Sequence, residues 1–347
     1  GVNLTAIAPT SNMRYLLGFS PLADERLCLL LVTGGGTRLV VPELNADQVE
    51  ARAGVRGIRW RDDAGPGEAL ELALDELDAR QPSTLAVDAA MRADALLLLQ
   101  EAARPQRSVN AADLMATLRM RKSEREIEAL ARAAAQADRA MMVGVETCRP
   151  GATEREVAQA IARAFREDGA EDVLATLVAS GPNGAFPHHE AGDRALEKGD
   201  TVVIDIVARL QGYCSDITRM VHLGEPSAEL RQVYDTVLAA NRRGREAVRP
   251  GARACDVDRA ARSVIEDRGY GQHFVHRTGH GLGMDVHEPP WISATNEQVL
   301  KPGMVFSVEP GIYLPGQFGV RIEDIVAVTE DGNRCLTGLD RELMVRG

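Results

Sequence analysis

An internal repeat constrains the fold of this chain more than any other feature of its sequence. The segment RPGATEREVAQAIARAFREDG, residues 149–169, aligns without gaps to RPGARACDVDRAARSVIEDRG, residues 249–269. The first four residues, an internal Val and Ala, and the final Gly are the same in both copies. Thr153 and Glu156 have the spacing of a capping box, so both copies are predicted to begin a helix after a Pro-Gly turn. The repeat therefore predicts a duplicated domain.

The similarity continues beyond these helices. LEKGDTVVID at 196–205 is echoed by LKPGMVFSVE at 300–309, so Asp205 occupies the position of Glu309. Each acid follows an apolar run that is typical of a buried strand, where an unpaired carboxylate is costly. If the two halves pack about a pseudo-twofold axis, Asp205 and Glu309 are expected to face each other.

Each half supplies a second acid on a following strand, Asp216 in GYCSDITR and Glu323 in GVRIEDIVAV. Four carboxylates that converge on one buried centre repel each other unless cations neutralise them, and four can hold two divalent ions. GHGLG adds an imidazole on a Gly-rich segment. The candidate metal ligands are Asp205, Asp216, His280, Glu309 and Glu323.

This ligand set indicates the metal and the chemistry. Four oxygen donors and one imidazole suit Mn²⁺, with Co²⁺, Zn²⁺ or Fe²⁺ as alternatives. Two ions that share bridging carboxylates can hold a hydroxide nucleophile near neutral pH and polarise a carbonyl. The sequence therefore predicts two divalent metal ions per chain and a hydrolytic reaction.

Composition argues against several other classes of function. The 40 basic and 51 acidic residues give a formal net charge of −11, which argues against a nucleic-acid or anionic-membrane partner. Five scattered cysteines without a CxxC motif argue against a disulfide framework or a zinc–thiolate site and favour a reducing, cytoplasmic location. The longest apolar stretches are too short to span a bilayer, and the N-terminus shows no signal-peptide pattern.

The length of 347 residues favours two domains. Residues 1–117 alternate strand-like and helix-like segments, with a hairpin at 27–42 around a Gly-rich turn, and are expected to form a small α/β domain. From about Met120 the sequence becomes one long, charged, Ala-rich helical segment, which opens a second domain over residues 118–347. The fold class is therefore a two-domain α/β protein.

These residues resemble the creatinase/aminopeptidase family with the pita-bread fold, which includes methionine aminopeptidases, Xaa-Pro aminopeptidases and Xaa-Pro dipeptidases (prolidases). The resemblance covers nearly the whole chain. It is carried by NMRYLLGF, GPNGAFPHH, GDTVVIDIVARLQGYCSDITR, HRTGHGLGMDVHEPP, SVEPGIYLPG and GVRIEDIVAV. It implies a creatinase-like N-terminal domain, a C-terminal pseudo-twofold α+β catalytic domain, an Xaa-Pro peptide substrate and a homodimer.

The resemblance also implies a role for each candidate metal ligand. Asp205 chelates one metal ion, and Asp216 and Glu323 bridge both. His280 and Glu309 complete the second ion, and Glu309 also serves as general base on the bridging water.

Other residues are implied to act around the metals. Arg321, two residues before a bridging acid, is implied to orient a metal ligand. Of the adjacent histidines 188 and 189, the first is preferred because the Pro-His step matches the family. The histidines implied to position the scissile carbonyl and stabilise the tetrahedral intermediate are His188, His276 and His287.

One segment departs from the prolidase pattern. Some prolidases place an Arg a few residues beyond the last of these histidines, where it binds the terminal carboxylate of the dipeptide. Here EPPWISA, residues 288–294, has Trp291 near that place and no Arg. The cation is then expected from elsewhere, and Arg38, after the Gly-rich turn in the N-terminal domain of the other subunit, is a candidate.

Three functions remain open. The leading one is metal-dependent hydrolysis of the bond before proline in Xaa-Pro dipeptides, because a compact chain with one N-terminal domain suits a bacterial-type prolidase. An Xaa-Pro aminopeptidase acting on longer peptides is the alternative, because the carboxylate-binding Arg is missing. A non-peptidase or binding member of the fold is disfavoured, because such members have typically lost metal ligands and all five are present here.

Overall fold

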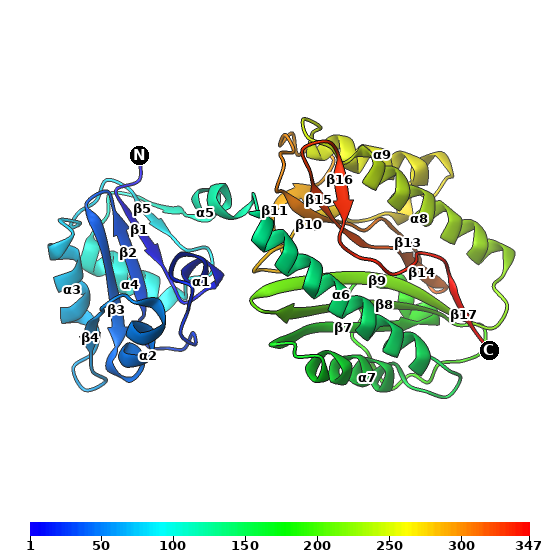
Figure 1. Ribbon diagram of the computed structural model, residues 1–347, viewed down its shortest axis with the longest axis horizontal. Helices are drawn as coiled ribbons and strands as arrows, with labels where there is room; N and C mark the ends of the chain where they lie inside the picture. The colour runs from blue at the N-terminus through cyan, green and yellow to red at the C-terminus, as the bar shows by residue number, and fades with distance from the viewer. The chain divides into compact units, whose positions relative to one another are not determined.

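The computed structural model describes residues 1–347, which divide into two compact units, Gly1–Arg119 and Met120–Gly347 (Figure 1). Separate clusters of buried apolar side chains form the core of each unit, so each is described by itself. None of the helices combines the length and apolarity that crossing a bilayer requires.

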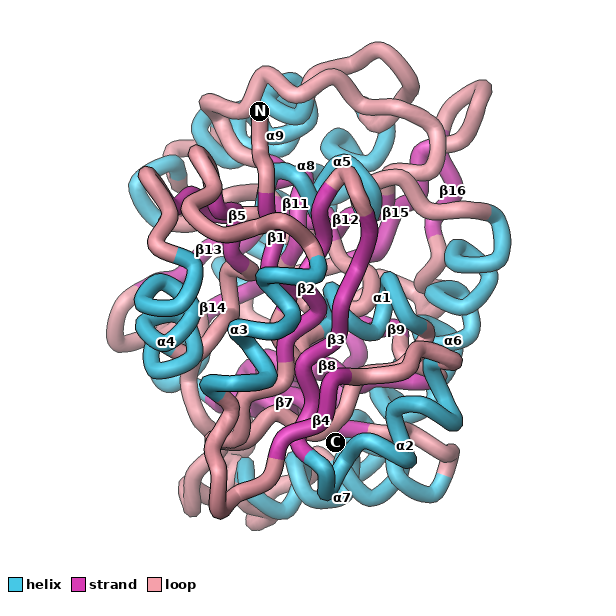
Figure 2. The backbone as a smooth tube through the Cα atoms, turned by 90° about the vertical axis from the view of Figure 1, so that its left-hand side faces the viewer, coloured by secondary structure: helices cyan, strands magenta, loops and turns pink.

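The N-terminal unit is built on a six-stranded sheet with the order β4-β3-β2-β1-β5-β6. Strands β2 and β3 pair antiparallel from Leu29↔Val40 to Thr33↔Gly36, which confirms the predicted hairpin, and Figure 2 shows strands β1 to β4 side by side. The strands are β1 (Leu4–Ile7), β2 (Leu29–Thr33), β3 (Gly36–Pro42), β4 (Ile58–Trp60), β5 (Leu85–Val87) and β6 (Ser108–Asn110).

Helices cover both faces of this sheet because successive side chains of a strand point to opposite sides. Leu29 and Leu31 pack with α3 and α4, whereas Leu30 packs with α1 and α2. The helices are α1 (Ser11–Leu17), α2 (Glu43–Ala53), α3 (Gly67–Glu76), α4 (Ala93–Ala103) and α5 (Ala112–Arg119).

The C-terminal unit contains four long helices, two 3₁₀ turns and three sheets. In Figure 1, α7 lies below its strands and α8 and α9 lie above them. The helices and turns are α6 (Glu124–Thr147), α7 (Glu154–Glu167), η1 (Gly181–Ala185), α8 (Ala228–Ala247), α9 (Ala254–Asp267) and η2 (Gly271–His273).

The strands of this unit form a four-stranded sheet, β17-β9-β8-β7, a five-stranded sheet, β11-β10-β12-β15-β16, and the hairpin β13-β14. The first sheet comprises β7 (Asp172–Ser180), β8 (Thr201–Leu210), β9 (Tyr213–Leu223) and β17 (Met344–Arg346). The others comprise β10 (Gly279–Gly281), β11 (Glu288–Ile292), β12 (Val305–Val308), β13 (Gly311–Leu314), β14 (Phe318–Arg321), β15 (Asp324–Val328) and β16 (Asn333–Cys335).

Matching backbone hydrogen bonds confirm the internal repeat. The amide of Gly151 donates to the carbonyl of Leu196 at 2.8 Å, and the amide of Gly251 donates to the carbonyl of Leu300 at 2.9 Å. The helix α7 begins with a capping box at Thr153, in which the Thr153 amide donates to Glu156 at 2.7 Å. At the start of α9 the equivalent amide, that of Arg253, donates to Asp256 at 3.3 Å. The alignment that equates Asp205 with Glu309 is therefore also an alignment of backbone structure.

Two of the predicted acids lie beside strands and not within them. Asp205 and Asp216 lie inside β8 and β9, but Glu309 is one residue past the end of β12. The residue that follows Glu309 is Pro310, whose nitrogen has no hydrogen to donate to a strand ladder. Glu323 lies in the short link between β14 and β15. The expectation of four acids on strands is corrected to two on strands and two at strand junctions.

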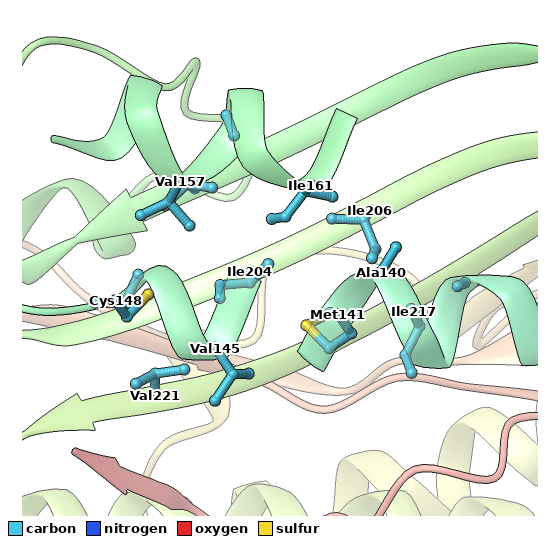
Figure 3. Packing of buried hydrophobic residues seen from close by; sticks show 14 of the residues in the cluster. Ala140, Met141, Val145, Cys148, Val157, Ile161, Ile204, Ile206, Ile217 and Val221 are labelled. Atoms are coloured by element: carbon cyan, nitrogen blue, oxygen red, sulfur yellow. The ribbon is translucent and has the colours of Figure 1, made fainter. Parts of the chain in front are cut away.

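Helices α6 and α7 pack on the outer face of β8 and β9 and hold these strands in place (Figure 3). Met141 and Val145 of α6 and Ile161 of α7 meet Ile204 of β8 and Ile217 of β9, all fully or almost fully buried. The strands that carry Asp205 and Asp216 are thus supported by a dry core.

Glycines bring the helices of each half close together. A Cβ on Gly144 of α6 would lie 2.6 Å from Cδ1 of Ile161 in α7. A Cβ on Gly244 of α8 would lie 3.3 Å from Cβ of Ala261 in α9. Both pairs are separated by the same number of residues, so the repeat extends to the helix–helix contact.

The contact at Gly144 gives a test of the packing. We expect Gly144→Ala to lower the free energy of unfolding by about 1–3 kcal/mol because the new methyl group overlaps Ile161. In an Ile161→Ala background the same change should be neutral or stabilising, because the space is open and Ala favours a helix over Gly by about 1 kcal/mol. Urea unfolding of the four proteins of this cycle measures the coupling, and an equal cost in both backgrounds contradicts the proposed overlap.

Candidate metal centre

Three of the predicted ligands form a tight, buried group. The ligand atoms of Asp216, His280 and Glu323 lie within 4.8 Å of one another. Nε2 of His280 is 3.7 Å from Oδ2 of Asp216 and 3.3 Å from Oε1 of Glu309. Asp205 lines the same cavity as these four residues. The structure therefore brings all five candidate ligands to one place.

Glycines on both sides of His280 allow its strand to fit. A Cβ on Gly279 would lie 1.8 Å from the carbonyl oxygen of Ser307, and one on Gly281 would lie 2.4 Å from that of Pro289. Nδ1 of His280 contacts the carbonyl of Gly281 at 3.2 Å, which directs Nε2 toward the carboxylates. The GHG motif is thus explained by close backbone packing as well as by its histidine.

The electrostatics of the group fit divalent cations. Burial and the charges of Glu323 and Asp205 raise the pKa of Asp216 well above its ordinary value. Burial and the charges of Glu309 and Asp205 raise the pKa of Glu323 in the same way. Burial raises the pKa of Glu309 to about 7, although the charge of Arg321 opposes this shift. Bound cations remove this repulsion, and the carboxylates are the hard oxygen donors that such cations prefer.

The imidazole of the group also has the form that a metal requires. Burial, followed by the neighbouring His287, lowers the pKa of His280 to about 3, so the ring is neutral at pH values where proteins function. Neutral imidazole is the form that binds metal ions.

Arg321 orients two of the acids. Its Nη2 donates to Oδ2 of Asp205 at 2.6 Å, and its Nε donates to Oγ1 of Thr218 at 3.1 Å. The Thr218 hydroxyl in turn donates to Oε2 of Glu323 at 2.8 Å. The predicted contact with a metal ligand therefore has geometric support, and Thr218 extends it to a second ligand.

Ser307 couples two further ligands, Glu309 and His280. Its hydroxyl donates to Oε1 of Glu309 at 3.0 Å and accepts from the amide of His280 at 3.0 Å. The amide of Glu309 donates to the carbonyl of Thr278 at 2.8 Å, and the Thr278 hydroxyl donates to buried Asp258 at 2.8 Å. These hydrogen bonds stabilise Glu309 in its position directly after a buried apolar strand.

The three predicted histidines line a cavity of about 1660 Å³ together with the ligand group. His276 is already engaged, since Nδ1 contacts the carbonyl of Arg277 at 2.7 Å and Nε2 contacts the hydroxyl of Tyr313 at 2.8 Å. Burial lowers its pKa to about 4. His287 packs edge-on to His280 with ring centroids 4.2 Å apart.

A buried acid separates the roles of two adjacent histidines. Nε2 of His189 contacts Glu154, a fully buried residue of α7, at 2.8 Å. Burial raises the pKa of Glu154, but hydrogen bonds from Asn183, Ser180 and His189 outweigh it and lower the pKa to about 2. His189 thus anchors the loop, and His188 is left exposed in the cavity.

The two predicted substrate residues outside this group have other partners. Arg38 pairs with Glu76 within the N-terminal unit. Trp291 lies opposite His280 in the β10–β11 pair, and the guanidinium of Arg277 lies 4.4 Å from the centre of its ring. The proposed role of Arg38 in a second subunit stays a prediction.

Sequence reasoning missed four residues that support the ligands or the loop beside them. All four lie inside segments already quoted, but their partners come from distant parts of the chain and cannot be read from spacing. The four are Glu154, Thr218, Arg277 and Tyr313.

A duplicated domain that gathers four carboxylates and one imidazole beside a cavity is the architecture of a metal-dependent hydrolase. Residues 128–330 match the metallopeptidase family M24, and residues 1–121 match the creatinase/prolidase N-terminal domain. The chain therefore belongs to metallopeptidase family M24. The predicted family, fold class and peptidase class are confirmed.

Similar proteins match the chain over almost its full length. A protein of Mycobacterium bovis named probable dipeptidase PepE is 42% identical over 345 residues, which are 98% of this chain and 91% of that protein. The Xaa-Pro dipeptidase of Pyrococcus furiosus is 37% identical over 97% of this chain and 94% of its own length. The crystal structure of a recombinant prolidase from Thermococcus sibiricus has a TM-score of 0.94 at 39% identity and covers 100% of this chain and 95% of its own.

Removing one charge from the group tests the site directly. Loss of a residue that only contacts a metal ligand typically lowers metal affinity or activity by about 10–100-fold. We expect Glu323→Gln to cause a larger loss, because Glu323 is itself a ligand in this assignment. Metal content by elemental analysis and circular dichroism check binding and folding separately. A folded variant with wild-type metal content and activity would overturn the assignment.

Thr218 provides a second test of the same group. Thr218→Val removes the hydroxyl between Arg321 and Glu323 at nearly constant volume, and metal affinity should fall by about 10–100-fold. Thr218→Ser keeps the hydroxyl and is the matched control, which should remain within a few-fold of wild type. Titration of the chelator-stripped proteins with Mn²⁺ makes the comparison, and equal affinities for the Val and Ser variants exclude the hydroxyl link.

Proposed function

We propose that this protein hydrolyses the peptide bond before proline in Xaa-Pro dipeptides, with two divalent metal ions bound by Asp205, Asp216, His280, Glu309 and Glu323. The observation that carries the proposal is the group of five candidate ligands at one cavity, three of them buried and close together, in a chain whose relatives, matched over almost their full length, are named dipeptidases. The hard donor set favours Mn²⁺. A homodimer and a cytoplasmic location complete the proposal, supported by the family resemblance of the N-terminal domain and by five free cysteines.

The metal ions, when bound, supply a Lewis acid for the scissile carbonyl and lower the pKa of water. Side chains of the protein transfer the proton and orient the substrate. Ser307 holds Oε1 of Glu309, so Oε2 is free to take a proton from the attacking water and to pass it to the leaving proline nitrogen. His188 and His287 face the cavity without a hydrogen-bonded partner in the protein and can donate to the carbonyl oxygen.

The bond before proline explains the need for such a site. It is a tertiary amide without an N–H, so a site that binds peptides through that hydrogen cannot hold it. The group described here acts on the carbonyl and on the leaving nitrogen alone.

One observation favours the second candidate, an Xaa-Pro aminopeptidase. The cavity of about 1660 Å³ exceeds the roughly 300–1,000 Å³ typical of small-molecule sites, and residues 288–294 contain no cation. A longer peptide therefore has space in the C-terminal unit taken by itself.

Substrate length decides between the two. After removal of metal with a chelator and restoration of Mn²⁺, we expect kcat/KM for an Xaa-Pro dipeptide to exceed that for the matching Xaa-Pro-Yaa tripeptide by at least about tenfold. An Xaa-Ala dipeptide is the control for proline specificity. Equal or faster cleavage of the tripeptide supports the aminopeptidase, and cleavage of neither proline peptide overturns both.

A further inference from the structure

A dipeptide substrate brings its own negative charge close to the reacting bond. Its terminal carboxylate is one residue away from the scissile carbonyl, beside a centre that already gathers four acids. A carboxylate that leaves water for such a place is costly unless a cation receives it. If the proposed dipeptidase function holds, a side chain of the protein has to supply the cation that binds this carboxylate.

The arginines around the cavity differ in whether their guanidinium group already has partners within the protein. Arg321 is held by Asp205, Tyr313 and Thr218, and Arg155 pairs with Asp193. The arginines of α7 at positions 163 and 166 also line the cavity, but both are exposed to solvent. This leaves one half-buried arginine for a ligand beside the metal centre.

That residue is Arg277, which lines the cavity and whose guanidinium makes no hydrogen bond or ion pair within the protein. Its backbone is fixed, because its carbonyl contacts Nδ1 of His276 and the next residue, Thr278, is tied to Asp258. A fixed backbone and an unmatched charge are what a ligand-binding side chain requires.

Trp291 holds the guanidinium in place. The charged group lies 4.4 Å from the centre of the indole ring, in the range of a cation–π contact. Trp291 pairs with His280 across β10 and β11, and residues opposite each other in an antiparallel pair lie on the same face of the sheet. A guanidinium that lies on a ring keeps its edge N–H groups free for a planar, bidentate partner.

The chain around Arg277 also contacts the metal centre. The carbonyl of the next residue, Thr278, accepts from the amide of Glu309 at 2.8 Å. Trp291, which the guanidinium contacts, lies opposite His280 in the β10–β11 pair. Arg277 therefore lies at the metal end of the cavity that it lines.

We propose that Arg277, held against the ring of Trp291, binds the free terminal carboxylate of the substrate and so makes the site select dipeptides. A dipeptide presents two carboxylate oxygens to the guanidinium fork. An amidated or longer peptide presents a neutral amide there and leaves the arginine without a charged partner. Trp291 then holds the guanidinium of Arg277 in position, and Arg277 provides the positive charge.

The test compares an Xaa-Pro dipeptide with its C-terminal amide in the Mn²⁺-loaded protein. We expect Arg277→Ala to raise KM for the free acid by about 10–100-fold, the usual loss for a hydrogen-bonded charge pair, with a smaller change in kcat. Cleavage of the amide should change by less than about threefold, since a neutral group loses no ion pair. Arg277→Lys should recover part of the loss, and Trp291→Phe should fall between wild type and Arg277→Ala.

Two controls separate this role from a structural one. Arg243→Ala removes an exposed arginine of α8 with the same change in net charge and should leave the acid-to-amide ratio unchanged. Metal content of every variant should equal that of wild type. If Arg277→Ala slows cleavage of the free-acid dipeptide and of its amide by the same factor, the proposal is wrong.

A binding measurement keeps the inference independent of turnover. Calorimetry with proline and prolinamide should show tighter binding of proline in wild type and no preference in Arg277→Ala. If the wild-type protein cleaves no Xaa-Pro peptide, the proposed function fails, while this preference for the carboxylate still supports the role of Arg277. Equal binding of proline and prolinamide in wild type overturns the role of Arg277 alone.

Discussion

The repulsion among buried carboxylates governs the organisation of the C-terminal unit. Asp216 and Glu323 are almost completely buried, and each has a raised pKa because of burial and neighbouring acids. Arg321 is the positive charge in direct contact with the group, through its ion pair with Asp205. The remaining negative charge has to be met by bound cations. Helices, strands and glycines around the group all serve to hold these acids together against their repulsion.

Much of this site could be predicted because the repeat equates positions that are far apart in sequence. The aligned segments predicted that Asp205 and Glu309 are equivalent, and the matching hydrogen bonds of Gly151 and Gly251 confirm the alignment. The capping box at Thr153 predicted the start of α7. These features depend on local spacing, so one sequence is sufficient to find them.

The remainder depends on contacts that spacing does not encode. Both nitrogens of His276 have partners, one of them Tyr313 on the β13–β14 hairpin, so its engagement could not be seen from the motif. Glu309 lies one residue beyond β12 and is followed by Pro310, which cannot donate to a strand ladder, whereas the apolar run taken alone predicts that the strand includes Glu309. The contact of Arg277 with Trp291 depends on a strand pair whose register shifts within β10.

The shared hydrogen bonds of the two halves have a consequence for the ancestry of the chain. A gene that encoded about half of the C-terminal unit, pairing with a second copy of itself, could form the same backbone frame around two acids from each copy. The turns at Gly151 and Gly251 are held by equivalent carbonyls, those of Leu196 and Leu300, while the side chains that face the cavity differ between the halves. The imidazole ligand, His280, comes from the second half alone, so a nearly symmetric backbone frame carries an asymmetric set of metal ligands.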